Sequence, residues 1–153
     1  MIIYKPQDHL PESIESLVTE ARVASQDAYA PYSRYKVGSA IRDTQGNIFK
    51  GSNQENASFP LCMCAERTTL YHYSSIIQKG EIESMAVYAL SSVESPDLPP
   101  SPCGACRQVL AEFQSRQERT IDLILSNQNG YVWHFQSISE LLPYAFDPKN
   151  LMI

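Results

Sequence analysis

The chain contains 153 residues, of which 43% are hydrophobic and 19% are charged, a composition typical of a globular protein with one buried core. We therefore expect a single domain over residues 1–153. The net charge of −5 and the pI near 5.1 argue against a nucleic-acid partner, because binders of polyanions carry a basic face. No apolar run has the length of a membrane span, and residues 1–6 lack a signal-peptide core, so we expect no membrane partner.

The first third of the sequence predicts a helix followed by a β-hairpin. Residues 11–30 place apolar side chains at intervals of three and four, which indicates a helix with one buried face. Residues 35–41 alternate between apolar and polar side chains, which predicts a strand with Tyr35 on its buried face. Turn-forming residues at 43–46 then lead into a second strand over residues 47–51.

The middle of the sequence predicts two helices separated by a strand and a long loop. A helix is expected from near Cys64 to about residue 78, where Gly80 follows as a stop signal. Residues 84–90 are rich in apolar side chains, which favours a central strand covered on both faces. Serine and proline dominate residues 91–102, so this segment is a loop that leads into a helix over residues 103–114.

The last part of the sequence predicts two strands that pair with each other. Residues 121–125 and 131–135 are apolar runs joined by the turn at 127–130. A parallel partner would need a crossover of a dozen or more residues, so the last strand must run antiparallel to the fourth. A short helix is expected from about residue 139, and an extended tail from residue 147. Together these elements predict an α/β fold of three layers, with helices on both faces of a single mixed sheet of about five strands.

Four cysteines stand at positions 62, 64, 103 and 106. In a small secreted protein they would suggest two disulfides, but this chain is long enough to need none. We therefore expect reduced thiols and a cytoplasmic location. Cys103 and Cys106 alone could form a redox pair. That reading would leave the Cys64-x-Glu66 sequence without a role.

The spacing of three cysteines favours a catalytic zinc site. Cys103 and Cys106 share a face on the first turn of a helix, and Cys64 offers a third sulfur, which leaves the fourth tetrahedral position open to water. Cys64 and Glu66 can converge only end-on, past a helix N-terminus. We therefore predict two helix N-termini directed at one metal, with Glu66 as the proton carrier. A structural site with four sulfurs, including Cys62, is the alternative.

Several motifs resemble those of the zinc-dependent cytidine deaminase superfamily, whose pattern is His- or Cys-x-Glu followed by Pro-Cys-x-x-Cys. Here the pattern is Cys64-x-Glu66 and Pro102-Cys103-x-x-Cys106. The resemblance extends over nearly the whole chain through further motifs: Ala30-Pro31-Tyr32-Ser33, Val37-Gly38, Asn53 to Ala57, Arg67-Thr68, Arg107-Gln108, and Leu141 to Pro143 with Phe146. The Cys-first version is similar to the small, homotetrameric branch that acts on free nucleosides.

The resemblance implies a cytidine deaminase-like fold and one Zn2+ per subunit. It also implies hydrolytic deamination of cytidine and 2′-deoxycytidine to the uridines, with release of ammonia, as in pyrimidine salvage. Glu66 would be the general acid and base in that reaction. A close relative acting on an antibiotic nucleoside such as blasticidin S is a second possibility. A non-catalytic zinc module for protein interaction is a third.

The same resemblance assigns roles around the substrate. Asn53 and Glu55, in the loop before Cys64, would bind the sugar 3′-hydroxyl as donor and acceptor. Tyr35 would line the base pocket, and the backbone N–H of Ala65 would hold the pyrimidine O2. Phe146 would reach the base in a neighbouring subunit of a homotetramer. Tyr32 is a further candidate for that interface.

Charge balance points to one more residue. Zinc with three thiolates carries a net charge of −1, which weakens it as a Lewis acid. Arg67 is the candidate that donates to one or more sulfurs and offsets this charge. Arg107 is the rival for the same task, although a surface helix position would explain it as well.

Overall fold

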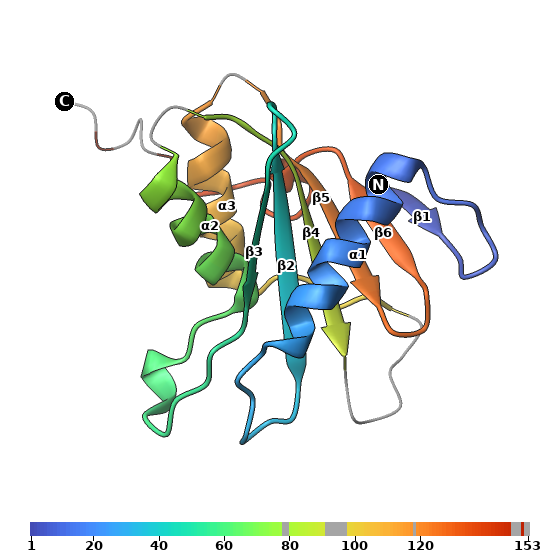
Figure 1. The fold of residues 1–153 in the computed structure, drawn as a ribbon. Coiled ribbons are helices and arrows are strands. Elements are labelled where there is room, and N and C mark those ends of the chain that lie inside the picture. Colours follow the sequence, from blue (N-terminus) through green and yellow to red (C-terminus); the bar gives the residue numbers. More distant parts are fainter. Residues whose placement is uncertain (78–79, 91–97, 118, 148–150, 152–153) are drawn as a thin grey trace.

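The computed structural model describes residues 1–77, 80–90, 98–117, 119–147 and 151. Within these residues, three helices surround one mixed sheet of six strands in the order β1-β6-β5-β4-β2-β3 (Figure 1). The strands are β1 (Ile2–Tyr4), β2 (Lys36–Asp43), β3 (Ile48–Ser52), β4 (Ile82–Leu90), β5 (Asp122–Asn127) and β6 (Val132–Phe135). The α-helices are α1 (Glu12–Gln26), α2 (Ala65–Ile76) and α3 (Gly104–Ser115), with short 3-10 turns at Phe59–Leu61 and Ile138–Glu140.

The strand directions follow from the lengths of the connections. The β2–β3 hairpin and the β5–β6 pair are antiparallel, whereas β5 runs parallel to β4 because α3 forms the crossover between them. The predicted antiparallel pairing of the last two strands is therefore confirmed. The prediction of about five strands was one short. It missed β1, an edge strand of three residues that pairs with β6 and is too short to show a period.

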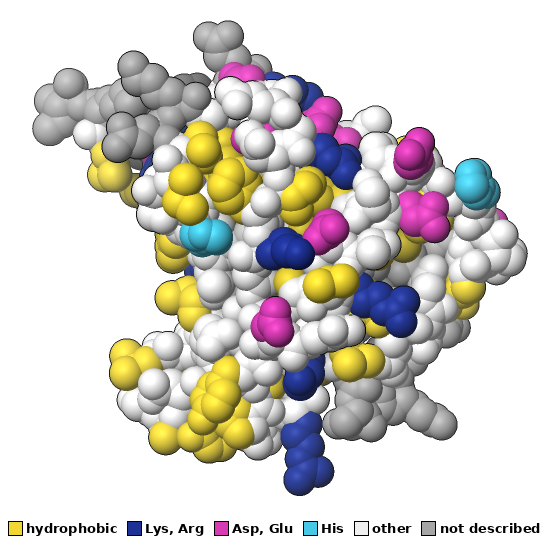
Figure 2. Space-filling view, in the orientation of Figure 1, with side chains coloured by type: hydrophobic (Ala, Val, Ile, Leu, Met, Phe, Trp, Pro, Cys, Tyr) yellow, Lys and Arg dark blue, Asp and Glu magenta, His cyan; other side chains and the backbone are white. Residues whose placement is uncertain are grey.

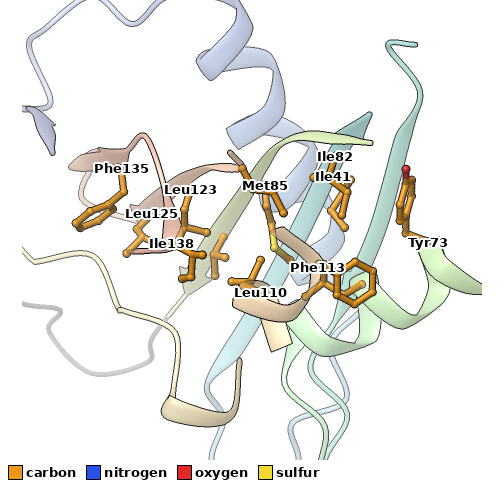
Figure 3. Close-up of a cluster of buried hydrophobic side chains, with 13 residues drawn as sticks. Ile41, Tyr73, Ile82, Met85, Leu110, Phe113, Leu123, Leu125, Phe135 and Ile138 are labelled. Carbon is orange, nitrogen blue, oxygen red and sulfur yellow. The ribbon is translucent and has the colours of Figure 1, made fainter. Parts of the chain in front are cut away.

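The two faces of the sheet bury different side chains. On the α1 face, small and branched residues such as Ala21, Ala40 and Ala86 form one cluster. On the face that α2 and α3 cover, larger side chains form a second cluster, drawn in Figure 3. Adjacent strand residues alternate between the clusters, with Ala40 on one side and Ile41 on the other. The predicted three-layer arrangement is thus confirmed.

Some boundaries differ from the sequence prediction. Helix α1 ends at Gln26 instead of continuing to residue 30, because Tyr29 leaves the helix and its backbone pairs with Asn53 and Glu55 in the loop between β3 and α2. Part of the predicted loop, residues 91–97, lies outside the described residues, as does most of the predicted tail beyond residue 147. In the described part of the chain, no helix combines the length and the apolarity that a bilayer crossing demands.

Candidate active site

Three cysteine sulfurs meet where α2 and α3 begin. Cys64 is the N-cap of α2 and Cys103 is the N-cap of α3, both with extended backbone, while Cys106 lies in the first turn of α3. The Cys64 and Cys103 sulfurs are 3.9 Å apart, the Cys103 and Cys106 sulfurs are 3.4 Å apart, and all three lie within 4.8 Å of one another. The predicted convergence of two helix N-termini is therefore present.

This donor set fits zinc. Tetrahedral Zn2+ with bonds of about 2.3 Å places neighbouring thiolate sulfurs roughly 3.8 Å apart, and the observed separations lie around this value. Cys62 does not join the cluster, because its sulfur contacts the backbone of Asn56, accepting from the N–H at 3.2 Å and donating to the carbonyl at 3.6 Å. Among the described residues, the potential metal-binding group contains three sulfurs and excludes Cys62. This geometry argues against the four-sulfur alternative.

The thiols of the cluster differ in acidity. Contact with the Cys106 thiol, followed by the Arg67 guanidinium, lowers the pKa of the Cys64 thiol to about 5. Contact with the Cys64 thiolate, burial and the Glu66 charge together raise the pKa of Cys106. One thiolate is thus present at neutral pH before any metal arrives. A metal ion that binds all three sulfurs must displace the remaining protons, so its affinity depends on pH.

Arg67 and Arg107 have different partners. The Arg67 Nη2 donates to the Cys64 sulfur at 3.6 Å, and this contact raises the pKa of the guanidinium. Arg107 instead donates from Nε to the Pro102 carbonyl at 2.8 Å and from Nη1 to the Leu141 carbonyl at 3.1 Å. The structure therefore brings Arg67 to the sulfurs, whereas Arg107 braces two backbone carbonyls.

Glu66 is buried beside the sulfurs and lines a cavity of about 520 Å³. The residue is only 5% exposed, and this burial raises the pKa of its carboxyl above the ordinary value. The negative charge at Cys64 acts in the same direction. A carboxyl group with a raised pKa near a metal site is suited to accepting and returning a proton.

The loop that carries Asn53 and Glu55 is fixed by backbone pairing. Gln54, between them, forms a parallel bridge with Tyr29 and an antiparallel bridge with Met63. Since Met63 directly precedes Cys64, this pairing holds the loop against the metal ligands. Both Asn53 and Glu55 consequently line the same cavity as Glu66.

The Glu55 carboxylate is held by three donors. Its Oε2 accepts from the backbone N–H of Tyr32 at 2.8 Å and of Ser33 at 3.3 Å. Its Oε1 accepts a short hydrogen bond from the Ser33 hydroxyl. A carboxylate has about four acceptor sites. Among the described residues, one site on Oε1 therefore stays available for a ligand.

Asn53 is held from both ends of its amide. Its Oδ1 accepts from the Val37 N–H at 2.8 Å, and its Nδ2 donates to the Tyr35 carbonyl at 2.9 Å. One Nδ2 hydrogen is left over, because the amide nitrogen carries two. The leftover donor of Asn53 and the leftover acceptor of Glu55 match one hydroxyl group, which both donates and accepts.

Two further residues, predicted from the sequence to contact the pyrimidine base, line the cavity. Ala65 is fully buried, and its N–H belongs to the first turn of α2, whose amide groups have no partner within the helix. Tyr35 lines the cavity but is 36% exposed, because β2 begins only at Lys36. The expectation that strand alternation buries Tyr35 was wrong. Burial of its hydroxyl, and secondarily the Glu66 charge, raise the pKa of Tyr35.

The structure does not bring Phe146 to this cavity. Phe146 is 58% exposed and lies beside α3, where its backbone N–H and C=O pair with the Gln108 amide at 3.0 and 2.9 Å. Tyr32 is also exposed and makes an edge-on contact with Phe59, with ring centroids 5.9 Å apart. Neither aromatic residue contributes to the described lining of the catalytic cavity within one chain.

Sequence reasoning missed Ser33 and Gln108 as organising residues. Both stand inside motifs that the resemblance covers, Ala30 to Ser33 and Arg107-Gln108. Their contacts join segments 22 and 38 residues apart. No local spacing rule predicts such a pairing.

Comparison with known proteins agrees with this geometry. Residues 11–120 match the family model described as the cytidine and deoxycytidylate deaminase zinc-binding region. The cytidine deaminase of Halalkalibacterium halodurans is 39% identical over 137 residues, covering 90% of this chain and 96% of that protein. The cytidine deaminase of Sporosarcina psychrophila is 35% identical over 138 residues, covering 90% and 94%. The crystal structure of cytidine deaminase from Burkholderia pseudomallei has a TM-score of 0.75 and 41% identity, covering 86% of this chain and 98% of that one. The chain therefore belongs to the zinc-dependent cytidine and deoxycytidylate deaminase family.

Proposed function

We propose that the chain hydrolyses cytidine and 2′-deoxycytidine to uridine and 2′-deoxyuridine with release of ammonia, with Glu66 as the proton carrier. The observation that supports this most directly is the buried Glu66 carboxyl beside three convergent sulfurs in an open cavity. A purely structural zinc module would not need a buried carboxyl group, such as that of Glu66, in the lining of a cavity. Cys64, Cys103 and Cys106 would hold the metal.

Glu66 moves the protons that the reaction requires. Zinc held by Cys64, Cys103 and Cys106 would supply a water that ionises near neutral pH, as the nucleophile for C4 of the pyrimidine. The Glu66 carboxylate accepts the proton that the attacking water loses and delivers it to N3 of the ring. It then transfers the remaining hydroxyl proton to the 4-amino group, which leaves as ammonia. Burial favours this role because it raises the carboxyl pKa above its ordinary value, which makes the group a better proton acceptor.

The remaining cavity residues recognise the nucleoside. Asn53 and Glu55 bind one sugar hydroxyl through their leftover donor and acceptor. The resemblance to the cytidine deaminase family implies that this group is the 3′-hydroxyl. Tyr35 packs against the base, and the Ala65 N–H binds the pyrimidine O2. The described lining contains two carboxylates and no Lys, Arg or His. A 5′-phosphate would meet negative charge there, which favours the free nucleoside over the nucleotide.

We also propose that the active form is a homotetramer in the cytoplasm. The exposed aromatic side chains of Tyr32 and Phe59 lie beside Glu55, which also lines the cavity, and Leu61 is exposed on the same 3-10 turn as Phe59. Figure 2 shows hydrophobic side chains on the lobe that the segment between β3 and α2 forms. Assembly would cover this surface and give Phe146, exposed on the side of α3, a base to contact in a neighbouring subunit.

Cytidine turnover tests the proposal. The loss of cytidine absorbance is followed with the wild type, with Glu66→Gln and, in parallel, with blasticidin S as substrate. We expect turnover of cytidine that Glu66→Gln lowers by roughly 10²- to 10⁴-fold without loss of zinc. An inactive wild type with stoichiometric zinc would refute the proposed function, and a preference for blasticidin S would favour the second substrate class. A stable, active monomer in light scattering would refute the role of Phe146 in a neighbouring subunit.

A further inference from the structure

The carboxylate of Glu55 is oriented by a single neighbouring turn. Residues 32 and 33 provide all three donors that the structure gives it, namely two backbone N–H groups and the Ser33 hydroxyl. These donors stabilise the ionised form, so the Ser33 hydroxyl and then the two N–H groups lower the pKa of Glu55. Of the three donors, only the hydroxyl can be removed by a side-chain substitution.

Ser33 also connects this carboxylate to the base pocket. Its Oγ accepts from the Tyr35 N–H at 3.0 Å while its hydroxyl hydrogen points to Glu55. The Tyr35 carbonyl, at the other side of the same residue, accepts from Asn53. The backbone of Tyr35 is therefore fixed between the two residues proposed to bind the sugar. Arg34 adopts a left-handed conformation, with φ of 57°, in the turn that these contacts close.

We propose that Ser33 is a positioning residue for sugar recognition, which it achieves by holding Glu55 with one free acceptor site directed at the substrate hydroxyl. This inference rests on the proposed function, because it assumes that Glu55 binds a nucleoside hydroxyl. The hydroxyl of Ser33 occupies one of the two sites on Oε1. With respect to the described residues, the site that is left over is then the open acceptor site of the Glu55 carboxylate, and the turn fixes its direction.

Removal of the Ser33 hydroxyl has a specific consequence. The Oε1 atom would gain a second open acceptor site that water fills, and the carboxylate would lose the contact that orients it. We expect weaker binding of substrates that possess the recognised hydroxyl and unchanged binding of substrates that lack it. Ser33 is exposed, so its replacement by alanine leaves no cavity in the core.

Kinetics of Ser33→Ala with two substrates test the proposal. We expect the KM for cytidine to rise about tenfold, with little change in kcat, while the KM for 3′-deoxycytidine stays the same. The conservative Ser33→Thr variant, which retains a hydroxyl, should restore the wild-type KM. In a Glu55→Ala background, Ser33→Ala should have no further effect on cytidine. An equal loss for both substrates, or independent effects of the two substitutions, would overturn the proposal.

A measurement that does not depend on turnover separates this inference from the proposed function. Carbon-13 NMR titration of the Glu55 carboxyl should give a lower pKa in the wild type than in Ser33→Ala, because the variant lacks one donor to the ionised form. An unchanged pKa would show that Ser33 does not hold the carboxylate and would refute the inference. A wild type that titrates as expected but does not bind or convert cytidine would instead refute the function that we propose.

Discussion

Replacement of Arg67 by alanine tests the charge balance of the metal centre. The Arg67 Nη2 lies 3.6 Å from the Cys64 sulfur. Two unit charges at this separation interact with roughly 4–5 kcal/mol at an effective dielectric constant near 20. The net value of a hydrogen bond to a charged group is lower, about 1.5–3 kcal/mol, because water competes for both partners. The lower interaction energy applies to Arg67, because its side chain is only partly buried and water can reach it.

If this stabilisation is expressed in the transition state, the loss of Arg67 lowers kcat by about 10- to 100-fold. The stability cost should be smaller, because the Nε of Arg67 is buried and has no partner in the described part of the chain, and truncation to alanine removes the free-energy penalty of that unpaired group. The assay combines cytidine turnover with zinc content and thermal unfolding. We expect Arg67→Ala to retain about one zinc per chain, and Arg67→Lys to recover part of the lost activity.

Arg107→Ala is the matched control. It removes an arginine that also lies in the first turns after a cysteine N-cap, four residues after Cys103, but one that donates to the Pro102 and Leu141 carbonyls. We expect a lower Tm with a smaller change in kcat. Full activity of Arg67→Ala with its metal in place would refute the charge-balancing role. A loss of kcat in Arg107→Ala equal to that in Arg67→Ala would show that the effect is not specific to the sulfur contact.

Further predictions concern the metal, the fold and pH. A strong chelator should abolish turnover and lower the Tm. Cys62→Ser should leave the zinc content at one per chain. Loss of the metal in that variant would instead support the alternative site with four sulfurs. Gly38→Ala should destabilise the fold by roughly 2–4 kcal/mol in urea denaturation, since its Cβ would lie 2.1 Å from the Ala21 carbonyl oxygen. The pKa of Glu55 is lowered in the folded state, so the stability that it contributes is present above its ordinary pKa and is lost as the pH falls through the folded value. Wild type and Glu55→Gln should therefore differ in urea midpoint at pH 7 and converge in acid, and a difference that persists in acid would contradict this.

Each half of the metal centre could be predicted because its determinants are local, whereas the pairing of Cys64 with Cys103, 39 residues apart, rested on the shared thiol chemistry and on the family resemblance. Cys103 and Cys106 are separated by about one helical turn. Cys64 and Glu66 are two residues apart and would point in nearly opposite directions within a helix, so their convergence requires that the helix begin between them. The strand pairing of β5 and β6 was equally predictable, since the length of their connection admits one direction only. In each case the sequence separation is short and a geometric rule applies.

The substrate side could not be derived in the same way. The contacts of Glu55 with Ser33, and of Asn53 with Val37 and Tyr35, join residues 16 to 22 positions apart through single hydrogen bonds. Isolated contacts of this kind have no period and follow no propensity. Tyr35 illustrates the limit, because the strand begins one residue later than predicted and is covered on both faces instead of one.

The site depends on the extended conformation of Cys64. Side chains two residues apart on a helix diverge by about 200°, so a helical Cys64 would direct its sulfur away from the Glu66 carboxyl. As the N-cap, with φ −72° and ψ 151°, Cys64 can instead project its sulfur across the end of α2. The preceding residue, Met63, has both of its backbone groups bonded to Gln54, at 2.8 and 2.9 Å. This bridge prevents the helix from beginning earlier, because a helical Met63 would have to give up those bonds. The same Gln54 bridge that holds Asn53 and Glu55, the residues proposed to bind the sugar, therefore also sets where α2 starts, so that the position of Cys64 and the lining of the cavity share one structural determinant.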